Sequence, residues 1–443
     1  MRLALALTVA LAALAATAGP AQACSCAGPI DPRGVLASAD AAFVGTLVER
    51  RDPGGNSSGS PVTLVFKVEE ALKGSLGETV EVTTSASSAS CGIDAEIGSQ
   101  TGVVLRRQGG VWTAGLCDQL SAAALRAAAQ PLPAPDGAGP PAFLVGGRFG
   151  DVTTIALDRR LRTLAYGKGE GTVRAIAVCP GSRRIADASW RDGGVTLRVR
   201  EAASLRVVRR WRIALPPTLQ PGALGCADPQ GRRVHVFVTS YDRPALARVL
   251  ATAGDGVRTL WRGTAQFASF AGSVAYLTAG RTGTALVRVD LDSGRATRLV
   301  ALPPYTGPLV PDPTGTSLAA VANDASATPT SSRLVVVDIG HRPARTRSVP
   351  LVSGLTGDVA WLSGGRLLFL PYGRSTARIF DPSLRTRPGF SGWPGGRAVV
   401  RADALLGIDF AGRLVTASLP RGPVRAVRLL PGPVVTTVVA IGP

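Results

Sequence analysis

Histidine is almost absent from this sequence. His235 and His341 are the only two, so a metal site or a catalytic triad built on histidine is not expected, and each is interpreted as a surface or turn residue. Lysine is nearly as rare, and the chain's positive charge is therefore almost entirely arginine. Aromatic residues make up only 5% of the chain, whereas Arg, Ala, Gly, Pro and Val are abundant, a bias typical of a high-GC bacterial genome.

Several chemical signatures are also missing. No two cysteines have the Cys-x-x-Cys spacing of a zinc site. No nucleophile motif, phosphate-binding loop or pair of catalytic carboxylates stands out. We therefore expect no enzyme, no cofactor and no intrinsic metal ion.

The chain begins with the pattern of a secretion signal. Arg2 gives a basic start, and residues 3–16 form an apolar run too short to remain in a bilayer as a spanning helix. Residues 1–23 are predicted to be a signal peptide that is cleaved after Ala23, so the mature chain begins at Cys24. We therefore expect a secreted or envelope-associated protein without a transmembrane helix. A lipid anchor on Cys24 is the alternative, which the missing Leu three residues earlier disfavours.

Charge is distributed unevenly along the chain. Residues 24–125 carry a net −4 and residues 126–443 about +22, within a total of +19. An exported basic surface favours anionic partners such as cell-wall polymers or phospholipid headgroups. Nucleic acid is not expected, because the chain is exported and has no nucleic-acid-binding motif. An arginine surface that serves only solubility is the alternative.

Residues 24–125 predict a small β-barrel domain. Alternating apolar and polar residues indicate five short strands, and a terminal helix follows them. Residues 69–74 are interpreted as a turn or a short helical piece. A closed barrel accommodates such strands. The expected strands are 41–48, 62–68, 79–84, 101–106 and 110–113, and the expected helix is 118–130.

Five short motifs in this domain resemble those of a known family. They are Cys24-Ser25-Cys26 and the segments 38–45, 66–74, 89–92 and 115–118. Together they resemble the netrin-type module, the N-terminal domain of the tissue inhibitors of metalloproteinases. The resemblance implies an oligonucleotide-binding-type barrel with disulfides Cys24–Cys91 and Cys26–Cys117. Each would close a long loop and stabilise the domain by about 4–5 kcal/mol at most.

The same resemblance suggests an inhibitory N-terminus. In those inhibitors, the amino group and carbonyl of the first cysteine chelate the zinc of a metalloproteinase, and the second residue enters its specificity pocket. Cys24, Ser25 and Cys26 are the matching residues in this chain. Disulfides that are retained only as structure are the alternative.

After a Pro/Gly linker at 126–141, residues 142–443 repeat with a period of about 40–48 residues. Each repeat has room for four strands, which predicts a β-propeller. Residues 143–171 hold only three strands, so 434–440 should complete that blade and close a ring of about seven. The turns at 228–231 and 312–315 share the sequence Asp-Pro-x-Gly. The repeats resemble Tol-B-type bacterial propellers.

Three groups of residues in the propeller are candidates for binding or structural roles. Cys179 and Cys226 occupy nearly equivalent points of adjacent repeats, which favours a disulfide over two buried thiols. Asp290, Asp338 and Asp381 end third strands and are interpreted as turn caps rather than as calcium ligands or catalytic carboxylates. Six arginines alternate with apolar residues and are expected mostly on one face of outer strands, as an anion-binding edge or a solvated one. These are Arg198, Arg200, Arg206, Arg209, Arg210 and Arg212.

Together these observations predict an exported all-β protein with a barrel and a propeller. We expect a non-enzymatic binding or adaptor protein of the bacterial cell envelope, whose propeller binds a protein or an anionic polymer. A metalloproteinase inhibitor acting through Cys24 is the first alternative. A propeller enzyme using carboxylate chemistry is the second.

Overall fold

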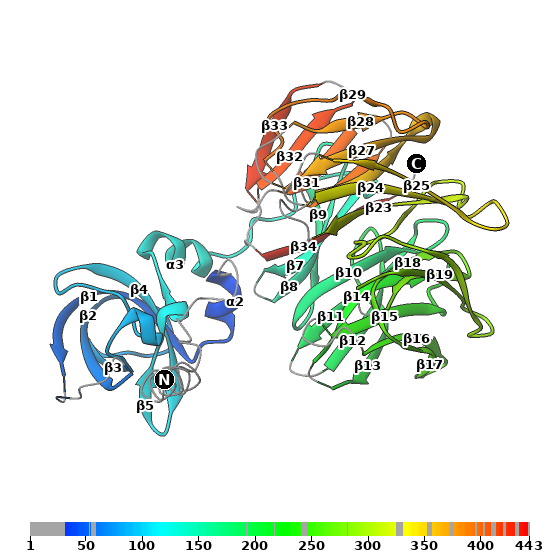
Figure 1. Ribbon diagram of the computed structural model, residues 1–443. Coiled ribbons are helices and arrows are strands. Elements are labelled where there is room, and N and C mark those ends of the chain that lie inside the picture. The colour runs from blue at the N-terminus through cyan, green and yellow to red at the C-terminus, as the bar shows by residue number, and fades with distance from the viewer. Residues whose placement is uncertain are drawn as a thin grey trace, which may run out of the picture. The chain divides into compact units, whose positions relative to one another are not determined.

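The fold is seen in a computed structural model of the chain (Figure 1). The chain divides into two compact units, Met1–Pro131 and Leu132–Pro443. Cys24, Ser25, Cys26 and the predicted signal peptide lie outside the described residues. The structure describes residues 32–52, 54, 59–149, 151–191, 194–216, 218–240, 246–280, 282–324, 331–351, 357–372, 376–394, 397–401, 404–408, 413–419, 422–429 and 434–441.

The first unit contains a closed five-stranded barrel. Its strands follow the order β1-β2-β3-β5-β4, and β4 pairs back onto β1, so these five strands close into a ring. The pairing of β3 with β5 is parallel and the others are antiparallel. The predicted barrel is confirmed. The strands are β1 (Ala41–Arg51), β2 (Pro61–Lys73), β3 (Thr79–Ser85), β4 (Gln100–Gln108) and β5 (Val111–Thr113), with β6 (Gln119–Leu120) paired to β4.

The prediction of a turn or helical piece at 69–74 is wrong, because β2 continues to Lys73. Val44 pairs with Glu70 and Ala42 with Lys73, and two register shifts accompany these pairs. Such bulges increase the local twist of a strand, as a small closed barrel requires. Cross-strand pairing thus overrides the local helical preference of this segment.

Two short helices cover part of the barrel. They are α2 (Pro32–Ala37), which was not expected from the sequence, and α3 (Ala122–Ala129), which lies within the predicted helix 118–130. Ser121 caps α3 by accepting the N–H of Ala124 at 3.2 Å, and Leu125 is fully buried. No helix in the described part of the chain is long and apolar enough to span a bilayer.

The second unit is a seven-bladed propeller, as predicted. The strands of each blade run in order from the innermost to the outermost. Blade 1 is β34 (Val434–Ala440), β7 (Phe143–Phe149), β8 (Val152–Leu157) and β9 (Thr163–Lys168). Blade 2 is β10 (Thr172–Val178), β11 (Arg184–Arg191), β12 (Gly194–Glu201) and β13 (Val207–Ala214). Blade 3 is β14 (Leu219–Cys226), β15 (Val234–Ser240), β16 (Ala247–Ala253) and β17 (Gly256–Gly263).

The remaining blades follow the same order. Blade 4 is β18 (Ala265–Ala271), β19 (Val274–Ala279), β20 (Ala285–Asp290) and β21 (Ala296–Ala301). Blade 5 is β22 (Val310–Pro311), β23 (Ser317–Asp324), β24 (Ser331–Asp338) and β25 (Arg345–Pro350). Blade 6 is β26 (Gly357–Leu362), β27 (Arg366–Pro371), β28 (Arg378–Phe380) and β29 (Thr386–Pro388). Blade 7 is β30 (Arg397–Arg401), β31 (Ala404–Ile408), β32 (Arg413–Ser418) and β33 (Val424–Leu429).

The hydrophobic core of the propeller lies between neighbouring blades. One cluster, for example, joins Leu197 and Trp211 of blade 2 to Val236 of blade 3. The ring closes where β34 pairs with β7, with Val439 opposite Leu144. This closure confirms the expectation that 434–440 completes the first blade.

Part of the predicted linker 126–141 has ordered partners within the second unit. The Gly137 N–H donates to the Thr163 carbonyl at 2.7 Å, and the Thr163 N–H donates to Asp136 Oδ1 at 2.8 Å. Residues 136 and 137 are thereby attached to the start of β9, the outermost strand of blade 1.

A buried ionic cluster lies between blades 1 and 2. Asp187 on β11 is fully buried and accepts Arg198 Nε at 2.7 Å and Arg200 Nε at 2.5 Å. Arg200 also donates to the carbonyls of Lys168 and Leu205 at 2.8 and 3.0 Å. The two guanidiniums are 2% and 1% exposed. The expected outer position is therefore wrong for Arg198 and Arg200, because alternation on β12 places both on the face that meets blade 1.

The chain of blade 1 passes directly over this cluster. A Cβ added at Gly169 would lie 2.6 Å from Arg198 Nη1 and 2.8 Å from Thr153 Oγ1. Only glycine leaves room for the guanidinium at this point.

We predict that Asp187→Ala lowers the free energy of unfolding by about 3–5 kcal/mol, because two buried guanidiniums lose their shared counter-charge. Asp292→Ala is the control, because Asp292 forms an exposed ion pair with Arg233 at 2.9 Å. Its loss should change the free energy of unfolding by less than about 1 kcal/mol. Urea unfolding of the two variants gives the comparison. Equal stability of both would contradict a structural role for the cluster.

Candidate functional site

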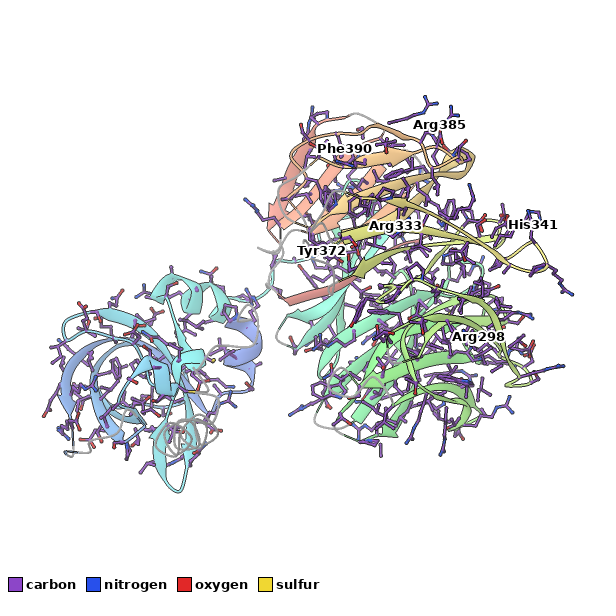
Figure 2. The ribbon with its side chains drawn as sticks, viewed as in Figure 1. Arg298, Arg333, His341, Tyr372, Arg385 and Phe390 are labelled. Atoms are coloured by element: carbon purple, nitrogen blue, oxygen red, sulfur yellow. A yellow bond between two sulfur atoms is a disulfide. The ribbon has the colours of Figure 1, made fainter. Side chains whose placement is uncertain are left out.

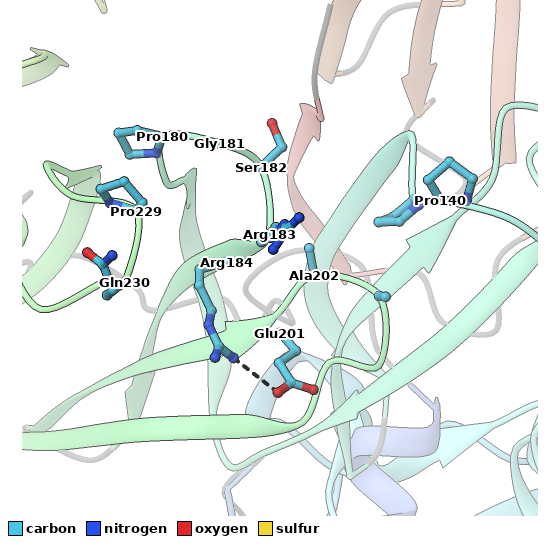
Figure 3. A pocket seen from close by; sticks show the side chains of 12 residues that line it. Pro140, Pro180, Gly181, Ser182, Arg183, Arg184, Glu201, Ala202, Pro229 and Gln230 are labelled. Carbon is cyan, nitrogen blue, oxygen red and sulfur yellow. Dashed lines mark ion pairs between the residues drawn. The ribbon is translucent and has the colours of Figure 1, made fainter.

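A cavity of about 830 Å³, which we call the three-turn pocket, opens at one end of blades 1 to 3 (Figure 3). Its walls come from the turns that join β10 to β11, β12 to β13, and β14 to β15, together with Pro140 and Pro141 before β7. All of these segments belong to the propeller unit. The pocket was not expected from the sequence.

A disulfide ties two of these turns together. Cys179 and Cys226 are bonded, with a Cα–Cα distance of 4.9 Å across a sequence separation of 47, which confirms the predicted pair. Each cysteine lies at or just after the end of an innermost strand, β10 or β14. The bond therefore fixes the spacing of the walls that carry Pro180 and Pro229.

The β14–β15 turn is further fixed by Asp228. Its carboxylate accepts the backbone N–H groups of Gln230 and Arg232 at 3.0 and 3.1 Å, and the Gly231 N–H closes the turn onto the Asp228 carbonyl at 3.1 Å. Gly231 has a φ of +66°, and a Cβ there would lie 2.5 Å from Val199 Cγ1. The Asp-Pro-x-Gly turn thus rests directly on blade 2 and cannot shift toward it.

Seven of the twelve residues that line the pocket are proline, alanine or glycine. Pro180 and Pro229 lie on one side and Pro140 on the other, with Ala202 between them (Figure 3). Proline rings offer no backbone N–H and keep φ fixed. The proline part of the lining is thus rigid and offers no backbone N–H, whereas the donors come from side chains such as Arg183 and Arg184.

The charged groups of the pocket leave an excess of positive charge. Arg184 Nη1 lies 3.2 Å from Glu201 Oε1, and Glu201 also accepts Arg206. The bond from Arg206, followed by one from the Ser204 hydroxyl, lowers the pKa of Glu201, so this carboxylate stays ionised. Arg183 is exposed and forms no ion pair with any carboxylate that the structure describes.

A second feature is the basic outer edge of the blades. Each of the seven outermost strands described contains Lys or Arg, and none contains Asp or Glu. On β13, Trp211 points inward and is buried while the arginines on either side are exposed. We call the following exposed side chains, none in an ion pair with a described carboxylate, the arginine rim: Arg209, Arg212, Arg258, Arg262, Arg298, Arg345 and Arg425. Figure 2 labels Arg298.

The aspartates singled out from the sequence cap turns in three different blades. Asp290 Oδ1 accepts the Ser293 N–H at 2.8 Å, and the N–H and hydroxyl of Ser293 lower the pKa of Asp290. Asp338 accepts the Gly340 N–H at 3.2 Å, and Asp381 accepts the Ser383 N–H at 2.9 Å. The interpretation as turn caps is confirmed.

The predicted disulfides of the barrel can be checked only at Cys91 and Cys117. Cys91 and Cys117 are each disulfide-bonded. Their predicted partners, Cys24 and Cys26, lie outside the described residues, so the pairing stays a prediction.

The two histidines differ sharply in environment. His341 lies in the β24–β25 turn, with Nε2 3.2 Å from Asp338 Oδ2, and its side chain is 61% exposed (Figure 2). His235 is a buried residue of β15 stacked on Phe270 with ring centroids 6.2 Å apart, so its interpretation as a surface or turn residue is wrong. Burial lowers the pKa of His235 to about 4. Within the described ranges, no group of three or more metal-binding side chains occurs.

Comparison with known proteins gives likenesses of fold alone. No family model matches the sequence, and no curated protein matches it. A candidate 6-phosphogluconolactonase from Bacteroides uniformis is 11% identical, with a TM-score of 0.49 over 68% of this chain and 99% of the other. The propeller domain of Cps50 (Swd1) from Myceliophteria thermophila is 12% identical, with a TM-score of 0.44 over 65% and 94%. Apo AztD from Citrobacter koseri is 14% identical, with a TM-score of 0.42 over 65% and 82%.

We predict that stability falls as pH drops from about 6.5 toward 4, because the unfolded chain takes up a proton at its histidine that folded His235 resists. At pH 4.5 this linkage should cost about 2–3 kcal/mol relative to pH 7.5. His235→Phe should remove that part of the loss, whereas His341→Phe should not. Urea midpoints at the two pH values provide the measurement. The same acid loss in all three proteins would exclude His235 as its source.

Proposed function

We propose that this chain is an exported, non-enzymatic binding protein of the bacterial cell envelope, and that its propeller binds an anionic polymer through the arginine rim. The observation that supports this is the charge of the seven outermost strands, which carry basic but no acidic residues. Repeated cations spaced around an edge suit a partner with repeated anions. A protein with an acidic surface is the alternative partner.

The rim arginines are held in place by the blades that carry them. Trp211 packs inward and donates its Nε1–H to the Gly254 carbonyl at 3.0 Å, which links β13 to the neighbouring turn of blade 3. Arg209 and Arg212 on this strand therefore project from a rigid surface. Because they already lie in solvent, contact with a polymer costs little desolvation and remains sensitive to salt.

We predict that the full chain binds dextran sulfate, used as a model polyanion, and releases it as salt rises. A quadruple variant, with Gln at Arg209, Arg212, Arg258 and Arg262, should bind at least about tenfold more weakly, a loss of about 1.4 kcal/mol. Lys at the same four positions keeps the charge and should keep most of the affinity. Titration by light scattering or dialysis at several salt concentrations gives the affinities. Binding that is indifferent to salt, or equal in the Gln and Lys variants, would count against the rim.

Inhibition of a zinc metalloproteinase through Cys24 is a second candidate function. It is favoured by the closed barrel and by the disulfide-bonded state of Cys91 and Cys117, the two cysteines that the netrin-type resemblance pairs with Cys24 and Cys26. A free amino group on a stapled first residue could fill an open zinc coordination position. We likewise propose that the barrel is netrin-like and that the propeller is of the Tol-B type.

We predict that the secreted protein begins at an unmodified Cys24, as intact-mass analysis would show. Adding one Ala ahead of Cys24 should abolish inhibition of a responsive metalloproteinase while the thermal unfolding temperature stays the same, since the amine is displaced but the fold is not. Equal inhibition by both forms, a lipid on Cys24, or a different first residue would each refute this mechanism.

A further inference from the structure

The three-turn pocket has the size and the lining of a small-molecule site, and it is separate from the arginine rim. Its volume of about 830 Å³ falls within the roughly 300–1,000 Å³ typical of ligand pockets. Such sites are mostly apolar, with a few polar groups that orient the ligand. The pocket fits this description, because its prolines and alanines provide the walls and its arginines provide the charge.

The walls of the pocket are held rigidly before any ligand arrives. The Cys179–Cys226 bond joins the turns that carry Pro180 and Pro229. Asp228 fixes the second of these turns through backbone N–H groups. A ligand that enters therefore orders few side chains, which reduces the entropic cost of binding.

The charge of the pocket selects the ligand's sign. The pocket lining contains Arg183, Arg184 and one carboxylate, Glu201. Glu201 is ionised and already engaged by Arg184 and by Arg206, which lies outside the lining. Arg183 is left without a counter-ion among the described residues and is exposed at the pocket. A guanidinium of this kind binds carboxylate, sulfonate or phosphate through charge-assisted hydrogen bonds.

We propose that the three-turn pocket binds a small amphiphilic anion, in which an apolar ring or short chain carries one anionic group. The apolar body packs against the rings of Pro140, Pro180 and Pro229, and the anionic group pairs with Arg183. Glu201 repels a second anionic group and so disfavours dianions with distant charges.

The test uses the full chain and the fluorescent probe 8-anilinonaphthalene-1-sulfonate, which combines an aromatic body with one sulfonate. Saturable binding at a stoichiometry near one is expected. Arg183→Gln should weaken it about tenfold, as expected for loss of one charge-assisted contact of about 1.4 kcal/mol. Ala203→Trp, which fills the pocket from its exposed wall, should abolish it. The matched controls are Arg295→Gln and Ala296→Trp, both at exposed positions of blade 4.

Two further arms separate the charge contact from the apolar one and from the proposed polymer binding. N-phenyl-1-naphthylamine, an uncharged relative of the probe, should be affected by Ala203→Trp but not by Arg183→Gln. The quadruple rim variant should bind the sulfonate probe normally, and the pocket variants should bind dextran sulfate normally. The proposal is overturned by the absence of a saturable site, or by pocket variants that bind the sulfonate probe as well as their blade 4 controls do. Circular dichroism verifies that each variant is folded.

Discussion

The propeller depends on one pairing, that of β34 with β7, which joins the end of the chain to the beginning of this unit. Without it, β7, β10 and β30 would each lose a neighbour, because β34 pairs with β7 and contacts both β10 and β30 in the ring. Every blade packs its core against the next one, so the closure is shared by all seven core layers. A ring of this kind has protected edges only if the first and last segments meet.

Two additional ties join blade 2 to the blades on either side of it. The buried cluster of Asp187, Arg198 and Arg200 joins blade 2 to blade 1, and the Cys179–Cys226 disulfide joins blade 2 to blade 3. Residues 136 and 137 also attach to the outer strand of blade 1. The three-turn pocket is built from these same blades, so the contacts that hold the blades together also make the pocket rigid.

Much of the fold could be predicted from the sequence, because periodic patterns and turns are local. The strands of both units, the seventh blade completed from the C-terminal segment, the Asp-Pro-x-Gly turns and the Cys179–Cys226 bond all follow from such signals. The continuation of β2 into residues 69–74 could not be predicted from local signals, because pairing with β1 determines it. The burial of Arg198 and Arg200 could not be predicted either, since alternation assigns residues to a face of the sheet but does not show which blade covers that face. The pocket was missed for a related reason. Its lining residues run from Pro140 to Gln230, and Cys179-Pro180-Gly181 and the turn after Cys226 were its only sequence signals.

Arginine occurs in several distinct environments in the described part of this propeller, and three of them bear on the argument. At the blade 1–2 interface it is buried around a carboxylate, and in the pocket it is partly balanced by Glu201. On the outermost strands it is exposed, and the residues of the arginine rim have no ion pair with a described carboxylate. Charged side chains on an edge strand prevent that edge from pairing with another chain, but a carboxylate does this as well as a guanidinium. The chain contains 30 Asp and Glu residues, so composition does not forbid them on these strands. Protection of the edges accounts for the presence of charge on these strands but not for its single sign, and this sign is the observation that supports the proposed binding of an anion.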